Sequence, residues 1–596
     1  MHYLLTARQM RDADRAARGM GLPAALLMER AALAASVTVA DLVHDPAAET
    51  VILCGPGNNG ADGIALARIL MERRIFPVVF YIPGRDYSDL FALQRKILEA
   101  VGAEINPVGG ELWHAFTEAG SPDIVVDAVF GTGLSRAPEG DYKEALKAAR
   151  LWKSRGAEII SLDIPSGVSA DGDVFPDAVR ADITVTFGEH KIGEILYPCA
   201  GYWGKVLRAE IGIPEKAVRL SDSSLYYTPD RDDLGGFIPP RNPAGSKIDF
   251  GRVLIAAGRS TMPGCAVLAA EAAFAAGAGM VRVFSGEDNR GAVLAARPEA
   301  MFTGYPDAGS GTDGTTEAIT HALKKDLSWA DVVVAGPGMG TDDIAAAVLE
   351  EILRSVEQKG AEASDSGESG VTGSGFTSAA RGVRGLVLDA DAITLIANRR
   401  ELRELLSRHD PEVQVILTPH PGELGRLAPE SRGAGLLQRT SAVRSLAGEL
   451  SCTVASKDCR TIVIGPAASR EMTLSGEIPD RCQDKPGLRT GDIFVNTLGN
   501  SGMGTAGSGD VLAGTAGAML AGWLKQEIPG GEEKYRGRFD EICPPEDSST
   551  GFKAAAAAVL LCAAAGDDAA LALGEHAMTA SDIRRCAGEI LRKLKV

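Results

Sequence analysis

Hydrophobic positions in the first third of the chain follow two patterns, one with helical spacing and one of short apolar runs. Between residues 6 and 43, Met10, Ala13 and Ala17, and then Leu26 and Leu27, fall at helical spacing. Farther along, short apolar runs alternate with helical patterns, as in a parallel sheet covered on both faces. We therefore predict strands at 50–54, 77–81, 124–129, 158–162 and 181–187.

The same alternation restarts after a polar stretch at 220–224 and predicts a second parallel sheet. Because 596 residues exceed what one hydrophobic core usually supports, we expect two doubly wound α/β domains, 1–220 and 221–596, divided at about 215–230. The first domain is expected to be a Rossmann-like three-layer fold. The strands predicted in the second are 252–256, 279–284, 331–335, 386–389, 415–418 and 461–464.

Three polar segments interrupt the pattern of the second domain. Residues 360–385 are rich in Gly, Ser, Glu and Ala, which predicts a mobile insertion. Residues 476–491 and 529–549 are bounded by better-patterned sequence, and we interpret both as surface excursions.

Composition and charge limit the partners of the chain. A net charge of −18 and a pI near 5.1 argue against a nucleic-acid surface, because phosphate binding needs a basic stripe. The longest apolar run, 554–565, is too short for a bilayer, and the N-terminus lacks a signal core, so we expect a cytoplasmic protein without a membrane span. The nine cysteines form no Cys-x-x-Cys pair and are expected to be buried thiols.

The candidate chemistry of the first domain lies where its predicted strands end. The loop 55–63 contains Gly-x-Gly-x-x-Gly, but the next strand ends at Tyr81 without the acidic residue of a dinucleotide fingerprint. Asn59, Asp127 and Ser166 offer the oxygen ligands that alkali or alkaline-earth cations prefer, and Asp163 is a candidate base. Turns and helix caps are the ordinary alternative for each such residue, but three polar clusters at three strand ends favour a site.

The second domain ends its strands in small and polar residues. His420 stands between Pro419 and Pro421, which favours a ligand contact over a casual surface position. Residues 499–510 form a glycine-rich run that leads into an apolar helix, so successive amides can surround a phosphate. Asp510 could accept the proton of an attacking hydroxyl, although an aspartate at a helix start can also be a simple cap.

The first domain resembles the NAD(P)H-hydrate epimerase family over residues 5–215. The motifs that carry this resemblance are Gly55 to Gly63, Asp127 with Gly131 to Gly133, and Asp163 to Gly167; Ala61 stands where the family usually has Gly. The resemblance implies a potassium site at Asn59, Asp127 and Ser166. The residues implied to surround the hydrated nicotinamide nucleotide are Asn58, Asn59, Gly60, Ala61, Asp62, Gly131, Thr132, Gly133, Leu134, Ser135, Arg136, Ala137 and Asp163.

Residues 225–596 resemble the ribokinase-like NAD(P)H-hydrate dehydratases. The matching motifs are Met262 to Ala266, Gly336 to Gly338, Pro419 to Glu423 and Gly507 to Asp510. The resemblance implies ADP or ATP with Mg²⁺ as co-substrate, which phosphorylates the hydrate before phosphate elimination. It implies hydrate contacts at Ala266, Gly338, His420 and Asp510, and nucleotide contacts at Lys457, Asp458, Cys459, Arg460, Thr461 and Gly509.

Two positions of the second domain depart from the family pattern. Asp458 follows Lys457 where the family usually has Gly, and Cys562 stands where a His often precedes the segment 565–567. Neither departure touches the 507–510 turn, but the first falls within the implied nucleotide contacts at 457–461.

The two resemblances together predict a bifunctional repair enzyme that epimerises the R and S hydrates of NADH and NADPH and dehydrates the S form. One alternative is a ribokinase-type small-molecule kinase with a regulatory first domain. Another makes the first domain a non-catalytic nucleotide or RNA-interaction module, against which Asn59, Asp127, Asp163 and Ser166 together argue. We expect small-molecule substrates, no nucleic acid, no membrane and a homo-oligomer.

Overall fold

The chain forms two compact units, His2–Tyr227 and Thr228–Val596, in a computed structural model. The structure describes residues 2–43, 45, 48–84, 86–120, 122–220, 224–305, 315–358, 382–466, 492–526 and 549–594. The predicted insertion 360–385 lies outside these residues up to 381. The predicted excursions 476–491 and 529–549 lie outside them up to 491 and 548.

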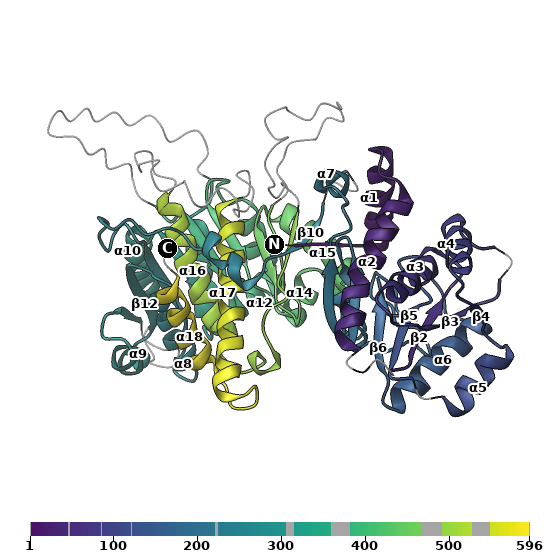
Figure 1. Ribbon diagram of the computed structural model, residues 1–596. Helices are drawn as coiled ribbons and strands as arrows, with labels where there is room; N and C mark the ends of the chain where they lie inside the picture. Colours follow the sequence, from purple (N-terminus) through teal and green to yellow (C-terminus); the bar gives the residue numbers. More distant parts are fainter. Residues whose placement is uncertain are drawn as a thin grey trace. The chain divides into compact units, whose positions relative to one another are not determined.

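The first unit is built around a parallel sheet (Figure 1). Its strands are β1 (His2–Leu5), β2 (Thr50–Cys54), β3 (Val78–Tyr81), β4 (Ile105–Pro107), β5 (Ile124–Ala128), β6 (Glu158–Leu162), β7 (Ile183–Phe187), β8 (His190–Lys191) and β9 (Lys205–Ala209). Its helices are α1 (Ala7–Gly19), α2 (Ala24–Leu42), α3 (Asn58–Glu72), α4 (Asp89–Ala100), α5 (Glu111–Ala119), α6 (Asp141–Ser154) and α7 (Glu215–Arg219). β10 (Tyr226–Thr228) marks the junction of the units.

Successive side chains of each strand point to opposite faces of the sheet, and this produces the three layers of the first unit. Ile52 and Cys54 of β2 pack with α2, α3 and α4, whereas Val51 and Leu53 pack with α5 and α6 on the opposite face. The strand order β4-β3-β2-β5-β6-β7-β9 reverses direction between β2 and β5. In open sheets of this kind, ligands bind outside the carboxyl ends of the strands at such a reversal.

The second unit repeats this plan with a larger helical layer. Its strands are β11 (Arg252–Ala256), β12 (Met280–Gly286), β13 (Met301–Tyr305), β14 (Val332–Ala335), β15 (Gly385–Leu388), β16 (Gln414–Leu417), β17 (Thr453–Ser456), β18 (Ile462–Ile464) and β19 (Ile493–Val495). Its helices are α8 (Pro263–Ala275), α9 (Arg290–Ala296), α10 (Thr315–Trp329), α11 (Asp343–Arg354), α12 (Ala390–Asn398), α13 (Arg400–Ser407), α14 (Pro421–Leu427), α15 (Leu436–Glu449), α16 (Ser508–Gln526), α17 (Thr550–Leu573) and α18 (Ala580–Lys593).

The sheet of the second unit also has a reversal point. Its order is β13-β12-β11-β14-β15-β16-β17-β18-β19, parallel as far as β17 and antiparallel from β17 through β19. The order reverses between β11 and β14, so the loops that follow these two strands flank the expected ligand crevice.

Small side chains let the helices of the second unit pack closely. α8, α16, α17 and α18 lie side by side (Figure 1). A side chain at Gly514 of α16 would begin 2.1 Å from the backbone oxygen of Ala269 in α8, so this contact joins backbone to backbone. Among the described helices, α17 alone is long and apolar enough to cross a membrane; 67% of its apolar window is buried inside the protein, as in a core helix.

The predicted α/β class and the two parallel sheets are confirmed, and the structure adds strands that the pattern did not reveal. The predicted strands are present with ends shifted by at most two residues, whereas β1, β4, β8, β9, β10, β13, β17 and β19 were not predicted. The predicted apolar run 554–565 belongs to a longer helix, because α17 continues through Asp567 and Asp568 to Leu573.

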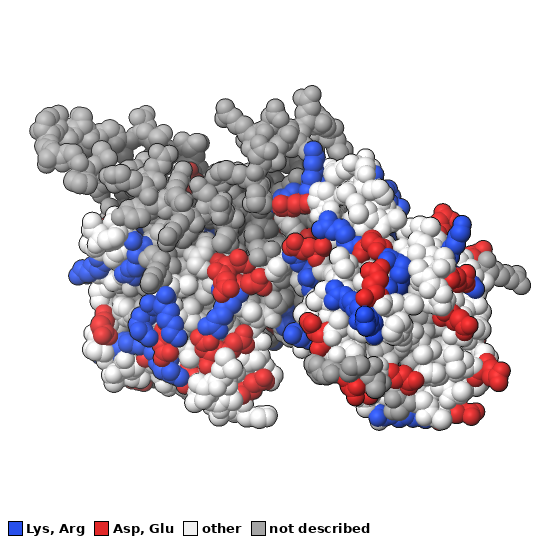
Figure 2. Space-filling view, viewed as in Figure 1, with Lys and Arg blue, Asp and Glu red and all other residues white. Residues whose placement is uncertain are grey.

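Positive and negative side chains are mixed on the visible surface. Figure 2 shows Lys and Arg interleaved with Asp and Glu on the described residues of this face. These residues form no broad basic patch on this face, which fits the net charge of −18.

The close contact between α8 and α16 predicts a strong effect of a single methyl group. Gly514→Ala should lower the free energy of unfolding by about 1–3 kcal/mol, because the backbone of Ala269 cannot easily move away. Gly448→Ala is the matched control, since a side chain there has no neighbour within 4 Å and should stabilise α15 by up to about 1 kcal/mol. Urea unfolding measures both; equal effects would contradict the packing described here.

Candidate functional site

The first site begins in the loop that joins β2 to α3 at the reversal point of the first sheet. α3 starts at Asn58, and its amide end faces the loop. A side chain at Gly60 would begin 1.7 Å from the backbone oxygen of Gly55, so the loop closes tightly on itself. Ala61 is fully buried, and the fold accommodates its methyl group without opening the loop.

Asp127 in β5 forms the centre of a buried hydrogen-bond network. Its carboxylate has no exposed surface and accepts bonds from the Ser161 hydroxyl at 2.9 Å, the Ser166 amide at 2.8 Å and the Ser166 hydroxyl at 2.5 Å. A fourth bond comes from the Val129 amide at 3.3 Å. Burial raises the pKa of Asp127, and the bonds from Ser166 oppose that rise. The network fixes the loop after β6 against β5.

Asn59 links the helix α3 to the same network. Its amide nitrogen donates to the carbonyls of Phe130 at 2.7 Å and Leu162 at 3.1 Å, while the Phe130 amide donates to the Ser166 hydroxyl at 2.9 Å. The Asn59 side-chain oxygen is buried and has no hydrogen-bond partner among the described residues. Asn59 and Ser166 both bond to the backbone of Phe130, and Ser166 bonds to Asp127, so the three predicted cation ligands are brought together.

Asp163 follows β6 directly and is held in an unusual conformation. Its φ is 64°, in the left-handed region. The Asp163 carboxylate pairs with the Lys191 ammonium at 2.5 Å, and Lys191 is fully buried and also donates to the Thr186 hydroxyl and the Phe187 carbonyl. The second carboxylate oxygen lies 3.2 Å from where a Gly131 side chain would begin, so it faces the loop 131–137.

Two further carboxyl groups lie near Asp163. Burial raises the pKa of Asp62 well above its usual range, and the negative charges of Asp163 and Asp14 raise it further. Burial and the charge of Asp163 likewise raise the pKa of Asp14 in α1. A carboxyl group whose raised pKa favours its protonated form therefore lies near the carboxylate that pairs with Lys191.

The predicted substrate residues of this site differ in their exposure to solvent. Asn58, Gly133, Ser135, Arg136 and Ala137 are exposed; Gly131 and Thr132 are partly buried; Asn59, Gly60, Ala61, Asp62 and Leu134 are buried. The loop 131–137 is also held from α1, because Arg11 donates to the Thr132 carbonyl at 3.4 Å.

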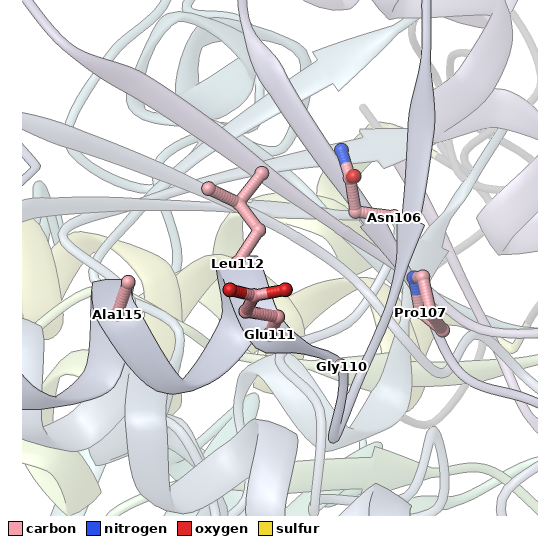
Figure 3. A pocket seen from close by; sticks show the side chains of 6 residues that line it. All are labelled: Asn106, Pro107, Gly110, Glu111, Leu112 and Ala115. Atoms are coloured by element: carbon pink, nitrogen blue, oxygen red, sulfur yellow. The ribbon is translucent and has the colours of Figure 1, made fainter.

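A surface hollow in the same unit is separate from this site. A hollow of about 470 Å³ lies at β4 and the start of α5. Figure 3 labels the residues that line it, Asn106, Pro107, Gly110, Glu111, Leu112 and Ala115. None of the predicted site residues lines it. Its position at the edge strand β4 is also away from the reversal point between β2 and β5.

The second site lies at the reversal point between β11 and β14. Asp510 is the third residue of α16, so Gly507, with φ 89°, precedes the helix. Burial raises the pKa of Asp510 to about 6, while a hydrogen bond from the Cys265 thiol lowers it and the charge of Asp389 raises it. A carboxyl group with a pKa of about 6 has the acidity that suits a general base near neutral pH.

Cys265 and Gly338 bring the two loops of the reversal point together. A side chain at Gly338, where φ is 58°, would begin 2.9 Å from the Cys265 sulfur. Ala266 has no exposed surface, whereas the thiol of its neighbour Cys265 forms a hydrogen bond with the Asp510 carboxylate. The Asp391 carboxylate accepts the Gly340 amide at 2.8 Å, which fixes the loop after β14.

Asp389 is the buried carboxylate of the second site. It directly follows β15, is 1% exposed, and accepts bonds from the Thr418 hydroxyl and the Lys457 ammonium, both at 2.7 Å. A side chain at Gly509 would begin 3.4 Å from the Lys457 ammonium nitrogen. Asp389 thus ties the loops after β16 and β17 to the start of α16.

His420 has a definite structural function in addition to its predicted ligand contact. Its Nδ1 accepts the amides of Gly422 at 3.0 Å and Glu423 at 3.4 Å, which caps α14, and its Nε2 lies 3.2 Å from Glu423 Oε1. Nδ1 must be unprotonated to accept, so Nε2 carries the hydrogen. Burial and the charge of Lys457 lower the pKa of His420, and burial raises the pKa of Glu423 to about 7.

The predicted nucleotide residues form a hairpin loop. β17 and β18 pair in antiparallel with Ser456 opposite Ile462, so Lys457 to Thr461 make the turn between them. The loop is held at both ends, because the Lys457 amide donates to Pro419 at 2.8 Å and the Asn496 amide donates to Thr461 at 2.8 Å.

Comparisons with known proteins match both units. The family described as YjeF-related protein N-terminus matches residues 24–193, and the family described as NAD(P)H-hydrate dehydratase matches residues 253–358, 375–477 and 486–587. A bifunctional NAD(P)H-hydrate repair enzyme of Thermofilum pendens is 32% identical over 512 residues, 85% of this chain and 84% of the relative. One of Moorella thermoacetica is 30% identical over 605 residues, 100% of this chain and 97% of the relative.

The chain belongs to the bifunctional NAD(P)H-hydrate repair enzymes. Among solved structures, an ADP/ATP-dependent NAD(P)H-hydrate dehydratase from Bacillus subtilis, co-crystallised with ATP and Mg²⁺, is 19% identical with a TM-score of 0.41. The match covers 61% of this chain and 98% of the Bacillus subtilis chain. Membership of the repair-enzyme family confirms the bifunctional prediction over a kinase with a regulatory domain and over a scaffold.

Both departures of this repair enzyme from the family pattern have a structural partner. Asp458 pairs with Arg439 of α15. Cys562 of α17 is buried, and its thiol lies 3.6 Å from the Thr515 hydroxyl of α16, which gives it a packing function between two helices.

Sequence reasoning on this repair enzyme missed Lys191, Cys265 as a partner of Asp510, and Arg439. Lys191 lies 28 positions beyond Asp163 and meets it only because β7 returns beside β6. Cys265 stands inside the motif Met262 to Ala266, so the sequence placed it near the site, but no function was predicted for its thiol. No local pattern distinguishes Arg439 from Arg444, the other arginine of its helix.

The network around Asp127 predicts that its charge is needed for folding. Asp127→Asn should lower the free energy of unfolding by about 2–4 kcal/mol, because the new amide hydrogens would face the donors of Ser161 and Ser166. Glu144→Gln on the exposed face of α6 is the control and should stay within about 0.5 kcal/mol. Thermal or urea unfolding measures both variants. An unchanged free energy of unfolding in Asp127→Asn would show that the network is dispensable.

Proposed function

We propose that the first unit interconverts the R and S hydrates of NADH and NADPH, with Asp163 as the group that moves the proton. The observation that carries this assignment is the Lys191–Asp163 pair, which ties one carboxylate oxygen and leaves the other facing the loop 131–137. Substrate contacts are assigned to Asn58 through Asp62, to Gly131 through Ala137 and to Asp163. The raised pKa of Asp62 supports this assignment, because it favours a proton-bearing carboxyl group near the base.

For the second unit, we propose dehydration of the S hydrate at the expense of ADP or ATP. Asp510 accepts the proton of the hydrate hydroxyl while the hydroxyl oxygen attacks the terminal phosphorus of the nucleotide. Loss of the phosphate group together with a ring proton then restores the nicotinamide ring. Amides at the start of α16 and the ammonium of Lys457 stabilise the phosphate charge. The substrate is assigned to Ala266, Gly338, His420 and Asp510, and the nucleotide to Lys457 through Thr461 and Gly509.

Potassium is proposed for the first unit and Mg²⁺ for the second. The buried Asn59 oxygen, which has no hydrogen-bond partner in the part of the chain that the structure describes, supports the potassium site. Asp127 and Ser166 would complete this site through the oxygens that now bond to one another. A bound cation would neutralise the anionic nucleotide near α3. Mg²⁺ would arrive with the nucleotide and would offset the negative charge of its phosphates. A homo-oligomer and a cytoplasmic location are proposed on family resemblance.

The two assignments predict that each activity can be removed alone. Asp163→Asn should stop epimerisation and leave dehydration of the pure S hydrate at its normal rate, because the base belongs to the first unit. Asp510→Asn should do the reverse and lower dehydration by about 10²–10⁴-fold. Assays on separated hydrates check both variants, and epimerisation at the normal rate in Asp163→Asn would refute the base assignment.

The pKa of Asp510 predicts the acid limb of dehydration. A base must be ionised, and burial raises the pKa of Asp510 to about 6, so kcat/KM should fall about tenfold per pH unit below that value. Cys265→Ala removes the hydrogen bond that lowers this pKa and should move the limb to higher pH. Initial rates across the pH range, with epimerisation as the internal reference, measure the shift; a limb that moves to lower pH would contradict the assignment.

A further inference from the structure

Arg439 of α15 is buried beneath the hairpin loop Lys457–Thr461. Its side chain is 6% exposed, yet it carries a full positive charge. Its guanidinium pairs with the Asp458 carboxylate and also donates to the Arg460 carbonyl at 2.6 Å. One side chain from the helix thus contacts two positions in the middle of the loop.

Asp458 adds contacts within the loop itself. Its carboxylate accepts the Cys459 amide at 2.7 Å, and its carbonyl accepts the Thr461 hydroxyl at 3.3 Å. The Asp458 side chain is 40% exposed, so its charge lies at the surface of the loop rather than in the core. Where the family usually has glycine, this chain has a carboxylate with a buried counter-charge.

The charge of Asp458 is unfavourable for an anionic ligand unless it is compensated. A carboxylate within a few ångströms of a nucleotide phosphate repels it strongly in a partly buried site. Arg439 supplies the compensating charge, and its burial is tolerated because both the carboxylate and a carbonyl accept its hydrogens. Removal of Arg439 would leave the loop less ordered and the Asp458 carboxylate without its buried counter-charge.

The position of the loop connects this pair with the phosphate end of the site. Lys457, adjacent to Asp458, donates to Asp389 at 2.7 Å, and its ammonium lies beside Gly509 at the start of α16. Since the loop ends are fixed by Pro419 and Asn496, the middle is the part whose order depends on side chains. A loop that is already ordered costs less conformational entropy when it binds a ligand.

We propose that Arg439 is a positioning residue for the adenine nucleotide: it holds the Lys457–Thr461 loop in its binding conformation and neutralises Asp458. This inference rests on the proposed nucleotide site. Arg439 acts through the loop and takes no part in proton or phosphate transfer.

The test measures binding of ADP and ATP with Mg²⁺ to the full chain by calorimetry. Arg439→Leu should raise Kd about tenfold or more for both nucleotides, while kcat at saturating nucleotide stays within about twofold. Arg439→Gln, which keeps one donor for the Arg460 carbonyl, should weaken binding less and tests the same point if Arg439→Leu folds poorly. The double variant Arg439→Leu/Asp458→Gly should recover most of the affinity, because both charges are gone.

Arg403→Leu is the matched control. Arg403 also joins a carboxylate, Glu449, and a backbone carbonyl, Leu427, but it does not contact the loop. Its replacement should leave Kd unchanged. Unchanged nucleotide affinity in Arg439→Leu, equal weakening in Arg403→Leu, or no recovery in the double variant would each overturn the inference. Failure of the unmodified chain to bind either nucleotide would instead refute the proposed nucleotide site.

Discussion

Each unit depends on one carboxylate that is buried at the carboxyl end of a parallel strand and satisfied by groups from neighbouring loops. Asp127 has no exposed surface and four hydrogen-bond donors, and Asp389 has 1% exposure with a hydroxyl and an ammonium as partners. A buried charge without such partners would cost several kcal/mol, roughly as much as a domain's whole stability. The loops must therefore close around the carboxylates, and in closing they form the sites.

This constraint explains why the two proposed bases, Asp163 and Asp510, are separate from the buried carboxylates Asp127 and Asp389 and lie near them. Asp163 and Asp510 are only partly exposed, and both keep one side toward a loop at a reversal point of the strand order. In both units the order reverses between the first strand of the sheet and its fourth, β2 with β5 and β11 with β14. In the functions proposed above, the same topology therefore supports two different reactions, a proton transfer in one unit and a phosphoryl transfer in the other.

The sequence predicted the α/β class and most of the strands that carry the sites, because these strands are continuous apolar runs between turn residues. β17, which leads into Lys457, was missed although it is fully buried. Edge strands were missed: Lys205–Ala209 and Met301–Tyr305 are only partly buried, so their apolar pattern is weak. Among site residues, those within a motif, such as Asn59 and Asp510, were predictable. Lys191 and Arg439 were not, because each meets its partner through folding over 28 and 19 positions without a local signal.

The central claim is that the two units treat one class of substrate in sequence. A mixture of R and S hydrates of NADH, incubated with the full chain, K⁺, Mg²⁺ and ADP or ATP, tests it most directly when the absorbance of NADH is followed to completion. The account predicts that NADH returns in an amount equal to both hydrates together, with one phosphate released per NADH. A stable phosphorylated product without NADH, or recovery limited to the S hydrate, would contradict it.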